Sequence, residues 1–200
     1  LSLHDALPIW VLLGLLQGIE AVSIPGCLKL YNHSTSEALS TYGVLTGMAL
    51  PCILFPSAIT NSVSIMLMPT VAELQVKDQA SGIRKLLQKV LGSCFLMGLF
   101  CCLFFLFFGQ LIGQFLFASD LAGNFIITLA WICPFLYVNG SLLSVLNGFG
   151  KTTTSFTINM VGLAIRIGSV FFAIPVFGIQ GYLWGLLISQ LAVRSEEHTS

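Results

Sequence analysis

An arginine in the middle of an apolar segment is the residue whose type and position point most clearly to chemistry. Arg166 lies 11 residues after Ser155, where an apolar stretch begins, and this spacing corresponds to about 16 Å along a helix axis. That depth is near the centre of a hydrocarbon core roughly 30 Å thick. A cation there costs about 2.5 to 3.5 kcal/mol on insertion scales, so it should face protein, water or an anion.

Two other residues bear on what Arg166 does. Asn159 precedes it by two helical turns on the same face, and Gly162 between them allows close approach. Glu20, in an earlier apolar segment, is the nearest available acid for an ion pair, and it could also be a coupling-ion or proton site. Two hypotheses therefore stay open: Arg166 and Asn159 bind an anion or lipid headgroup in a cavity, or Arg166 forms a fixed structural pair with Glu20.

Hydroxyl and amide side chains interrupt two further apolar segments. Such groups either join helices by hydrogen bonds worth around 0.6 kcal/mol each or line a cavity, and we take Asn61 and Asn139 as candidate substrate contacts. Pro56 frees a backbone carbonyl, which indicates a helix packed in a bundle or beside a wet cavity. The polar residues are Thr60, Asn61, Ser62 and Ser64 in one segment and Asn139, Ser141, Ser144 and Asn147 in the other.

No residue pattern predicts a catalytic or metal centre. A phosphate-binding loop at residues 148–152 would need a glycine where Val145 stands, so this segment is expected to be a tight cytoplasmic turn. We predict no catalytic residues, metal, cofactor or nucleic-acid partner, and a chain that is not an enzyme. Six cysteines lack the spacing of a zinc site or a disulfide framework and are expected to serve packing: Cys27, Cys52, Cys94, Cys101, Cys102 and Cys133.

The elements that must position these residues are membrane helices. The chain is 56% hydrophobic and only 8% charged, with a mean hydropathy of +0.94, whereas a soluble domain carries roughly 25% charged residues. We predict an all-α, polytopic transmembrane bundle in the lipid bilayer, with residues 109–117 forming an interfacial helix or turn. Four complete spans are expected near residues 40–68, 86–108, 125–146 and 155–176, and two truncated ones at 10–25 and 179–193.

Both ends of the sequence resemble translated sequencing adapters. The likeness covers residues 1–9 and residues 194–200 without a break. We therefore exclude both segments from fold reasoning and expect residues 10–193 to be an internal piece of a longer transporter.

Basic residues predict the orientation in the membrane. Four of them cluster after the span expected at 40–68 and Lys151 follows the one expected at 125–146, whereas only Lys29 lies near the opposite loops. The positive-inside rule then places the loop from Lys77 to Lys89 in the cytoplasm of a multi-pass plasma-membrane protein. The clustered residues are Lys77, Arg84, Lys85 and Lys89.

An ordered series of segments adds a resemblance to a known family. Together they resemble the stage V sporulation protein B branch of polysaccharide transporters, within the multidrug, oligosaccharidyl-lipid and polysaccharide exporter superfamily, to which lipid II flippases also belong. Gly26 and Cys27 depart from that branch, where a more basic sequence is expected. The segments lie at residues 20–25, 37–49, 56–73, 134–137 and 147–151.

The resemblance implies two pseudo-symmetric helix bundles around a central cavity, alternating access, and a place for this chain at the start of the second bundle. It also implies a lipid-linked saccharide as substrate, with Arg166 where the branch often has a basic residue. The function predicted is a flippase or exporter of lipid-linked oligosaccharide, polysaccharide or peptidoglycan precursors, in a cell that forms spores. The alternatives are a drug/cation antiporter of the same superfamily and, less favoured, a membrane-embedded transferase. The oligomeric state is left open.

Overall fold

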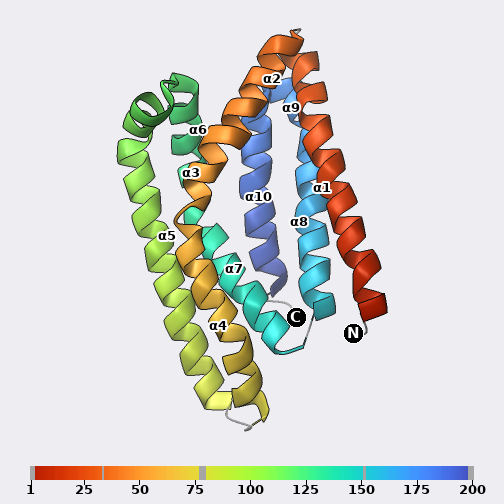
Figure 1. Cartoon of the computed structure of the whole chain (residues 1–200), viewed down its shortest axis with the longest axis vertical. Coiled ribbons are helices and arrows are strands. Elements are labelled where there is room, and N and C mark those ends of the chain that lie inside the picture. The colour runs from red at the N-terminus through yellow and green to blue at the C-terminus, as the bar shows by residue number, and fades with distance from the viewer. Residues whose placement is uncertain (1–2, 33, 77–79, 151, 198–200) are drawn as a thin grey trace. The chain divides into compact units, whose positions relative to one another are not determined.

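The computed structural model describes residues 3–32, 34–76, 80–150 and 152–197, and these ranges are helical apart from short turns. Four helices in them are long and apolar enough to cross a membrane, or five if one bent pair forms a single span. The prediction of an all-α, polytopic bundle is therefore confirmed (Figure 1). The chain forms two compact units, one from Leu1–Gly43 with Phe156–Ser200 and one from Val44–Ser155.

The first unit is built mainly from three long helices and two short ones. Gly178, between the short helix α9 and the long helix α10, has a φ of +63°, a conformation that favours glycine. A Cβ at this position would lie 2.8 Å from the ring of Tyr31, so the α9–α10 turn packs closely on α1. The helices are α1 (Leu3–Asn32), α2 (Thr35–Val44), α8 (Thr152–Phe172), α9 (Ile174–Phe177) and α10 (Ile179–Glu197).

The second unit packs a long helix against two broken ones. α5 lies against α6 and α7, and α7 also lies against α4. Leu67, Val71 and Val145 form a buried cluster that joins α4 to α7. The elements are the π-helical turn η1 (Leu45–Ala49), α3 (Leu50–Leu54), α4 (Ser57–Val76), α5 (Ala80–Phe117), α6 (Asp120–Ala130) and α7 (Cys133–Gly148).

Glycines on one face of α5 allow its neighbours to approach closely. A Cβ at Gly98 would lie 2.5 Å from the Cα of Pro134 in α7, and one at Gly113 would lie 2.4 Å from the backbone nitrogen of Gly123 in α6. Small residues have this role in membrane bundles because packing between backbones, rather than burial from water, drives helices together in lipid. The face of α5 that packs on α6 and α7 therefore requires small residues at these positions.

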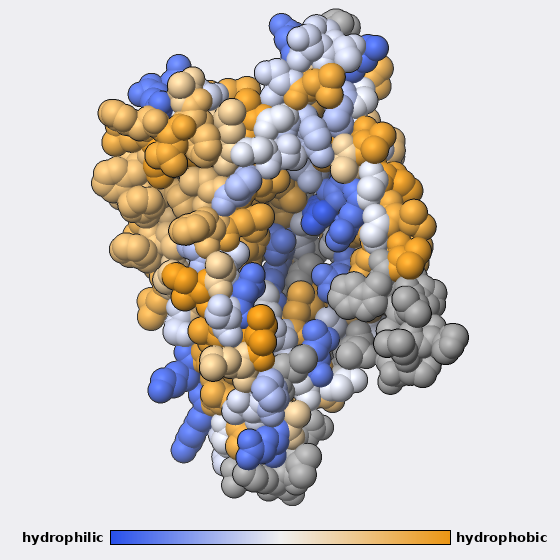
Figure 2. Space-filling view, in the orientation of Figure 1, coloured by the Kyte–Doolittle hydropathy of each residue, from blue (hydrophilic) through white to orange (hydrophobic). Residues whose placement is uncertain are grey.

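Much of the remaining surface of α5 is exposed and strongly apolar. Large apolar side chains recur there from Phe95 to Leu116 at three- and four-residue spacing, and Figure 2 shows apolar colour over the upper part of α5 and over α6. A surface of this kind fits lipid rather than water. The exposed residues are Phe95, Leu96, Leu99, Phe100, Leu103, Phe104, Phe107, Phe108, Leu111, Phe115 and Leu116.

Two expectations about the spans were wrong. Residues 109–117 are the last turns of α5 and not a separate interfacial helix or turn, because residues 80–117 contain no proline and Gly109 and Gly113 pack against α6. The helix ends at Phe117, and Ala118 after it has a φ of +47°. The segment 40–68 was expected to be a single span, but it is broken at Phe55 and Pro56. The part before the break, Thr35–Leu54, is long and apolar enough to cross by itself.

The expected span at 125–146 falls within the bent pair, since α6 and α7 meet at 57° after Ala130. At the chain ends, α1 begins at Leu3 and α10 ends at Glu197, while residues 1–2 and 198–200 lie outside the described ranges. Of the residues used to predict orientation, Lys77 and Lys151 are likewise outside them.

Candidate functional site

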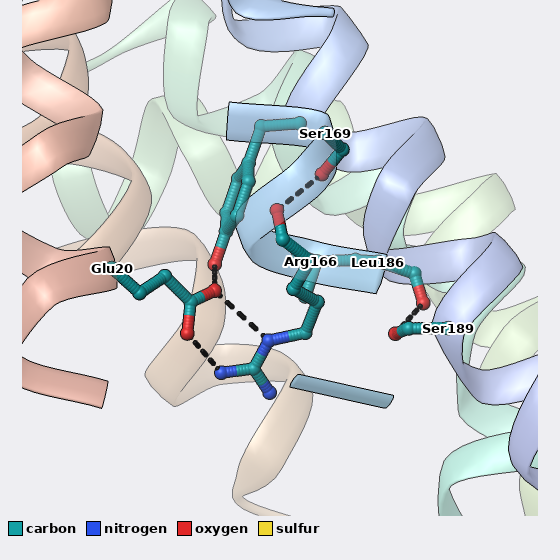
Figure 3. Close-up of polar contacts among 6 residues, drawn as sticks. Glu20, Arg166, Ser169, Leu186 and Ser189 are labelled. Carbon is teal, nitrogen blue, oxygen red and sulfur yellow. Dashed lines mark hydrogen bonds and ion pairs between the residues drawn. The ribbon is translucent and has the colours of Figure 1, made fainter. Parts of the chain in front are cut away.

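Three side chains from three helices of the first unit meet at the carboxylate of Glu20, which binds Arg166 and Tyr182. Nε of Arg166 donates a hydrogen bond of 2.9 Å to Oε1 of Glu20, and Nη2 of Arg166 donates a second to Oε2 (Figure 3). The hydroxyl of Tyr182 donates to the same Oε1 at 2.8 Å. Glu20 comes from α1, Arg166 from α8 and Tyr182 from α10. We call this group the Glu20–Arg166–Tyr182 cluster.

The cluster neutralises two charges inside an apolar part of the chain. Glu20 is only 4% exposed and Tyr182 6%, whereas the side chain of Arg166 is 28% exposed. The carboxylate receives three donors, which compensates much of the desolvation of a buried charge. Removing one member of such a buried pair is more damaging than replacing both, because the remaining charge has no partner.

Two glycines bring the first turns of α10 close to the end of α8, near the cluster. A Cβ at Gly185 would lie 2.0 Å from Oγ of Ser169, and one at Gly181 would lie 2.6 Å from the carbonyl oxygen of Ala173. These glycines flank Tyr182 on α10, so the start of α10 lies close to Ser169 in the last turn of α8 and to Ala173, which follows it. Ser169 also donates a 2.7 Å hydrogen bond to the carbonyl oxygen of Arg166.

One edge of the guanidinium is not used by Glu20. Arginine has five N–H donors in a planar fork, and the carboxylate engages only the Nε and Nη2 side. Figure 3 shows the other terminal nitrogen of Arg166 turned away from Glu20. Among the described residues, the structure gives that nitrogen, Nη1, no hydrogen-bond partner. The chemistry that remains available is donation to an anion.

The three asparagines predicted as substrate contacts are divided between the units. Asn159 is exposed on α8, two turns before Arg166 in the same unit. Asn61 on α4 is exposed and Asn139 on α7 is 4% exposed, and both belong to the second unit. A Cβ at Gly140 would meet Oδ1 of Asn61 at 3.6 Å, so the structure brings Asn61 beside this part of α7. Their role as substrate contacts stays a prediction.

A second buried polar group surrounds the break between α3 and α4. Pro56 has no N–H and disrupts the helical hydrogen bonds around it. The hydroxyl of Tyr137 on α7 donates to the carbonyl oxygen of Ile53 at 3.1 Å, and Oγ of Ser57 donates to that of Leu54 at 2.6 Å. The carbonyl oxygens of Ile53 and Leu54 at the break thus accept hydrogen bonds from side chains, which suits backbone at membrane depth.

The six cysteines are all free thiols. Cys94 on α5 lies 3.0 Å from Oγ of Ser141 on α7, so one of them joins two helices by a polar contact. In the parts of the chain that the structure describes, no three His, Cys, Asp or Glu side chains gather into a possible metal site.

Sequence reasoning identified Arg166 and Glu20 but missed Tyr182 and Tyr137. A charge in an apolar segment is conspicuous, whereas a tyrosine hydroxyl is compatible with a lipid interface, a core or a specific bond. One signal was present for Tyr182. It stands between Gly181 and Gly185, and small residues four apart indicate close helix packing.

Comparison with known proteins yields one curated relative. No protein-family model matches the chain, and no solved structure matches it either. The chain is 24% identical over 176 residues to stage V sporulation protein B of Bacillus subtilis (strain 168), an alignment that covers 87% of this chain and 34% of the relative. The chain spans about a third of the relative's length and is similar, over most of its own, to a part of stage V sporulation protein B.

Proposed function

We propose that this chain is part of a multi-pass plasma-membrane transporter that carries lipid-linked oligosaccharide, polysaccharide or peptidoglycan precursors across the bilayer by alternating access. The membrane-length helices and the similarity to stage V sporulation protein B support a membrane protein of this general kind. The relative's name connects that protein with sporulation, and we extend this connection to the cell envelope of a spore-forming cell.

The observation that carries the proposal is the half-occupied guanidinium of Arg166. Glu20 occupies one edge, and Nη1 faces away from it on a side chain that is 28% exposed. A planar guanidinium recognises phosphate oxygens in a bidentate way. A pyrophosphate-linked lipid supplies such oxygens together with the apolar chain that holds it in the membrane.

The ion pair also fits a transporter that must exist both empty and loaded. In the empty protein, Glu20 neutralises Arg166, which avoids an uncompensated cation at membrane depth. In the loaded protein, the anion approaches Nη1, and Tyr182 continues to donate to Oε1 of Glu20. Asn159, on the same helix as Arg166, is a further proposed substrate contact.

The antiporter alternative uses a carboxylate as the main cation-binding group. Glu20 already accepts hydrogen bonds from Arg166 and Tyr182, so a cation would have to compete with both. This geometry favours an anionic substrate for the cluster.

The test separates transport from assembly in the full-length protein. Arg166→Ala combined with Glu20→Gln removes both charges, so the double variant should reach wild-type abundance, because no buried carboxylate is left without a partner. We expect it to transport little or no lipid-linked pyrophosphate substrate in proteoliposomes. Arg166→Lys keeps the charge but loses the planar fork, and we expect partial transport.

The matched control is Lys89→Ala, which removes a cation from an exposed position on α5 and should leave the transport rate unchanged. If the double variant is both abundant and fully active, Arg166 is a structural partner of Glu20. The ligand-binding role would then have to be abandoned.

A further inference from the structure

We propose that Tyr182 is a positioning residue for anion binding by Arg166: its hydroxyl fixes Glu20 on the Nε edge of the guanidinium and thereby keeps the Nη1 edge open. This inference rests on the proposed function, because it concerns how the same site meets a pyrophosphate.

One oxygen of Glu20 is shared by two donors. Oε1 of Glu20 accepts from the Tyr182 hydroxyl at 2.8 Å and from Nε of Arg166 at 2.9 Å. Oε2 accepts only from Nη2 of Arg166 in the described part of the chain. Tyr182 is therefore bonded to the oxygen that marks the Nε side of the ion pair.

A carboxylate can pair with a guanidinium in two bidentate ways. It can bind side-on, to Nε and one terminal nitrogen, or end-on, to both terminal nitrogens. Glu20 binds side-on. An end-on pair would use Nη1, the nitrogen that we propose for the substrate, so the two geometries differ in whether Arg166 can accept an anion.

Tyr182 selects between these geometries. If Glu20 moved to the end-on position, Oε1 would leave Nε and with it the Tyr182 hydroxyl, at the loss of a hydrogen bond to a charged group. Tyr182 is 6% exposed and lies between Gly181 and Gly185, which closely approach Ala173 and Ser169 and so fix this part of α10 beside the end of α8. The hydroxyl is thus an anchor that cannot easily follow the carboxylate.

The experiment measures transport of an undecaprenyl-pyrophosphate-linked disaccharide by the full-length protein in vesicles of phosphatidylethanolamine and phosphatidylglycerol. For Tyr182→Phe we expect KM to rise about tenfold, as for the loss of one hydrogen bond to a charged group, while the maximal rate stays within a factor of about two. Tyr31→Phe is the matched control, because Tyr31 is 47% exposed and its ring packs on Gly178. Its KM should not change.

Two replacements that fill the space of the hydroxyl distinguish positioning from packing. 4-Aminophenylalanine in place of Tyr182 keeps a donor and should retain the wild-type KM. 4-Fluorophenylalanine has a similar shape but no proton to donate, and should raise KM as Tyr182→Phe does. If Tyr182→Phe accumulates poorly, the KM of the fluorinated variant distinguishes positioning from packing.

A double-mutant cycle tests whether Tyr182 acts through Glu20. In a Glu20→Gln background, where the charged ion pair is absent, Tyr182→Phe should change KM less than twofold. Equal effects in both backgrounds would overturn the inference, as would an unchanged KM for Tyr182→Phe and for the fluorinated variant. If the wild-type protein does not transport the probe at all, the proposed function fails, and this inference fails with it.

Discussion

At Arg166, a charge that is costly in a membrane is retained because it is paired. Glu20 is the more deeply buried partner, at 4% exposure against 28% for the side chain of Arg166. The two partners therefore differ in how well each tolerates the loss of the other. A partly exposed guanidinium can recruit water, whereas a buried carboxylate would keep only Tyr182 as a donor.

This asymmetry gives a stability prediction at the residue scale. Arg166→Ala should destabilise the protein by about 3 kcal/mol, because it leaves a buried carboxylate without its cation. Glu20→Gln should destabilise it by less. Thermal unfolding of the purified full-length variants in one detergent measures both effects, and a larger loss for Glu20→Gln would contradict the burial argument.

The charged residues of the site could be predicted from the sequence, and the tyrosines could not. Arg166 and Glu20 could be found because an ionised group at membrane depth needs a partner, and chain spacing alone fixes that depth. Tyr182 and Tyr137 act through hydroxyls whose partners lie more than 80 residues away in the chain. No local pattern encodes such distant pairing, so their roles required the fold.

At the scale of the helix, the face of α5 that packs on α6 and α7 requires small residues. We expect Gly98→Ala to destabilise the second unit by about 1 to 3 kcal/mol, since its Cβ would lie 2.5 Å from the Cα of Pro134 and 3.0 Å from the carbonyl oxygen of Cys133. Backbone atoms cannot move aside as a side chain can.

Gly92→Ala on the same helix is the control for Gly98→Ala. A Cβ there meets nothing within 4 Å, so this substitution should be neutral or slightly stabilising. Unfolding midpoints of both variants, measured in the same detergent, check the comparison. Equal midpoints would show that the close approach of α5 to α7 does not limit stability.

The break between α3 and α4 gives a second prediction at this scale. Tyr137→Phe removes the donor to the carbonyl oxygen of Ile53 and should cost about 1 to 3 kcal/mol, because a buried acceptor is left unsatisfied. Hydrogen exchange of the backbone amides in residues 50–60 should accelerate, while exchange in α5 stays unchanged. Uniform acceleration throughout the unit would indicate a general loss of packing.

The elements themselves were predicted unevenly. Hydropathy located most of the apolar segments because membrane helices need long apolar runs. It placed the end of α5 too early, since Gly109, Gln110, Gly113 and Gln114 resemble a turn in composition. The structure uses the two glycines for packing, and the two glutamine amides donate to Asp120 at 3.2 and 2.8 Å.

For the whole molecule, the two ends of α5 test the predicted orientation. Lys85 is exposed near the start of α5, and Leu121 is 38% exposed just beyond its end. In a full-length, cysteine-free protein, Leu121→Cys should react with an impermeant thiol reagent in intact cells. Lys85→Cys should react only after the membrane is permeabilised, because basic residues favour the cytoplasmic side.

The control for labelling is Leu96→Cys, on the exposed apolar face of α5, which should resist the polar reagent in both conditions because lipid covers it. Labelling of Lys85→Cys in intact cells, with protection of Leu121→Cys, would reverse the orientation and overturn the cytoplasmic assignment of the basic cluster.

The exposed apolar face of α5 has a consequence for the membrane itself. At 1.5 Å per residue, the stretch from Phe95 to Leu116 covers about 32 Å, close to the hydrocarbon thickness of roughly 30 Å. The first turns of α5, with exposed Arg84, Lys85 and Lys89, then extend past the acyl chains to the level of anionic headgroups. In a thinner bilayer, hydrophobic mismatch would tilt α5 or locally thicken the bilayer around it. Because α6 and α7 pack on the glycines of α5, a tilt of α5 would also move the rest of the second unit.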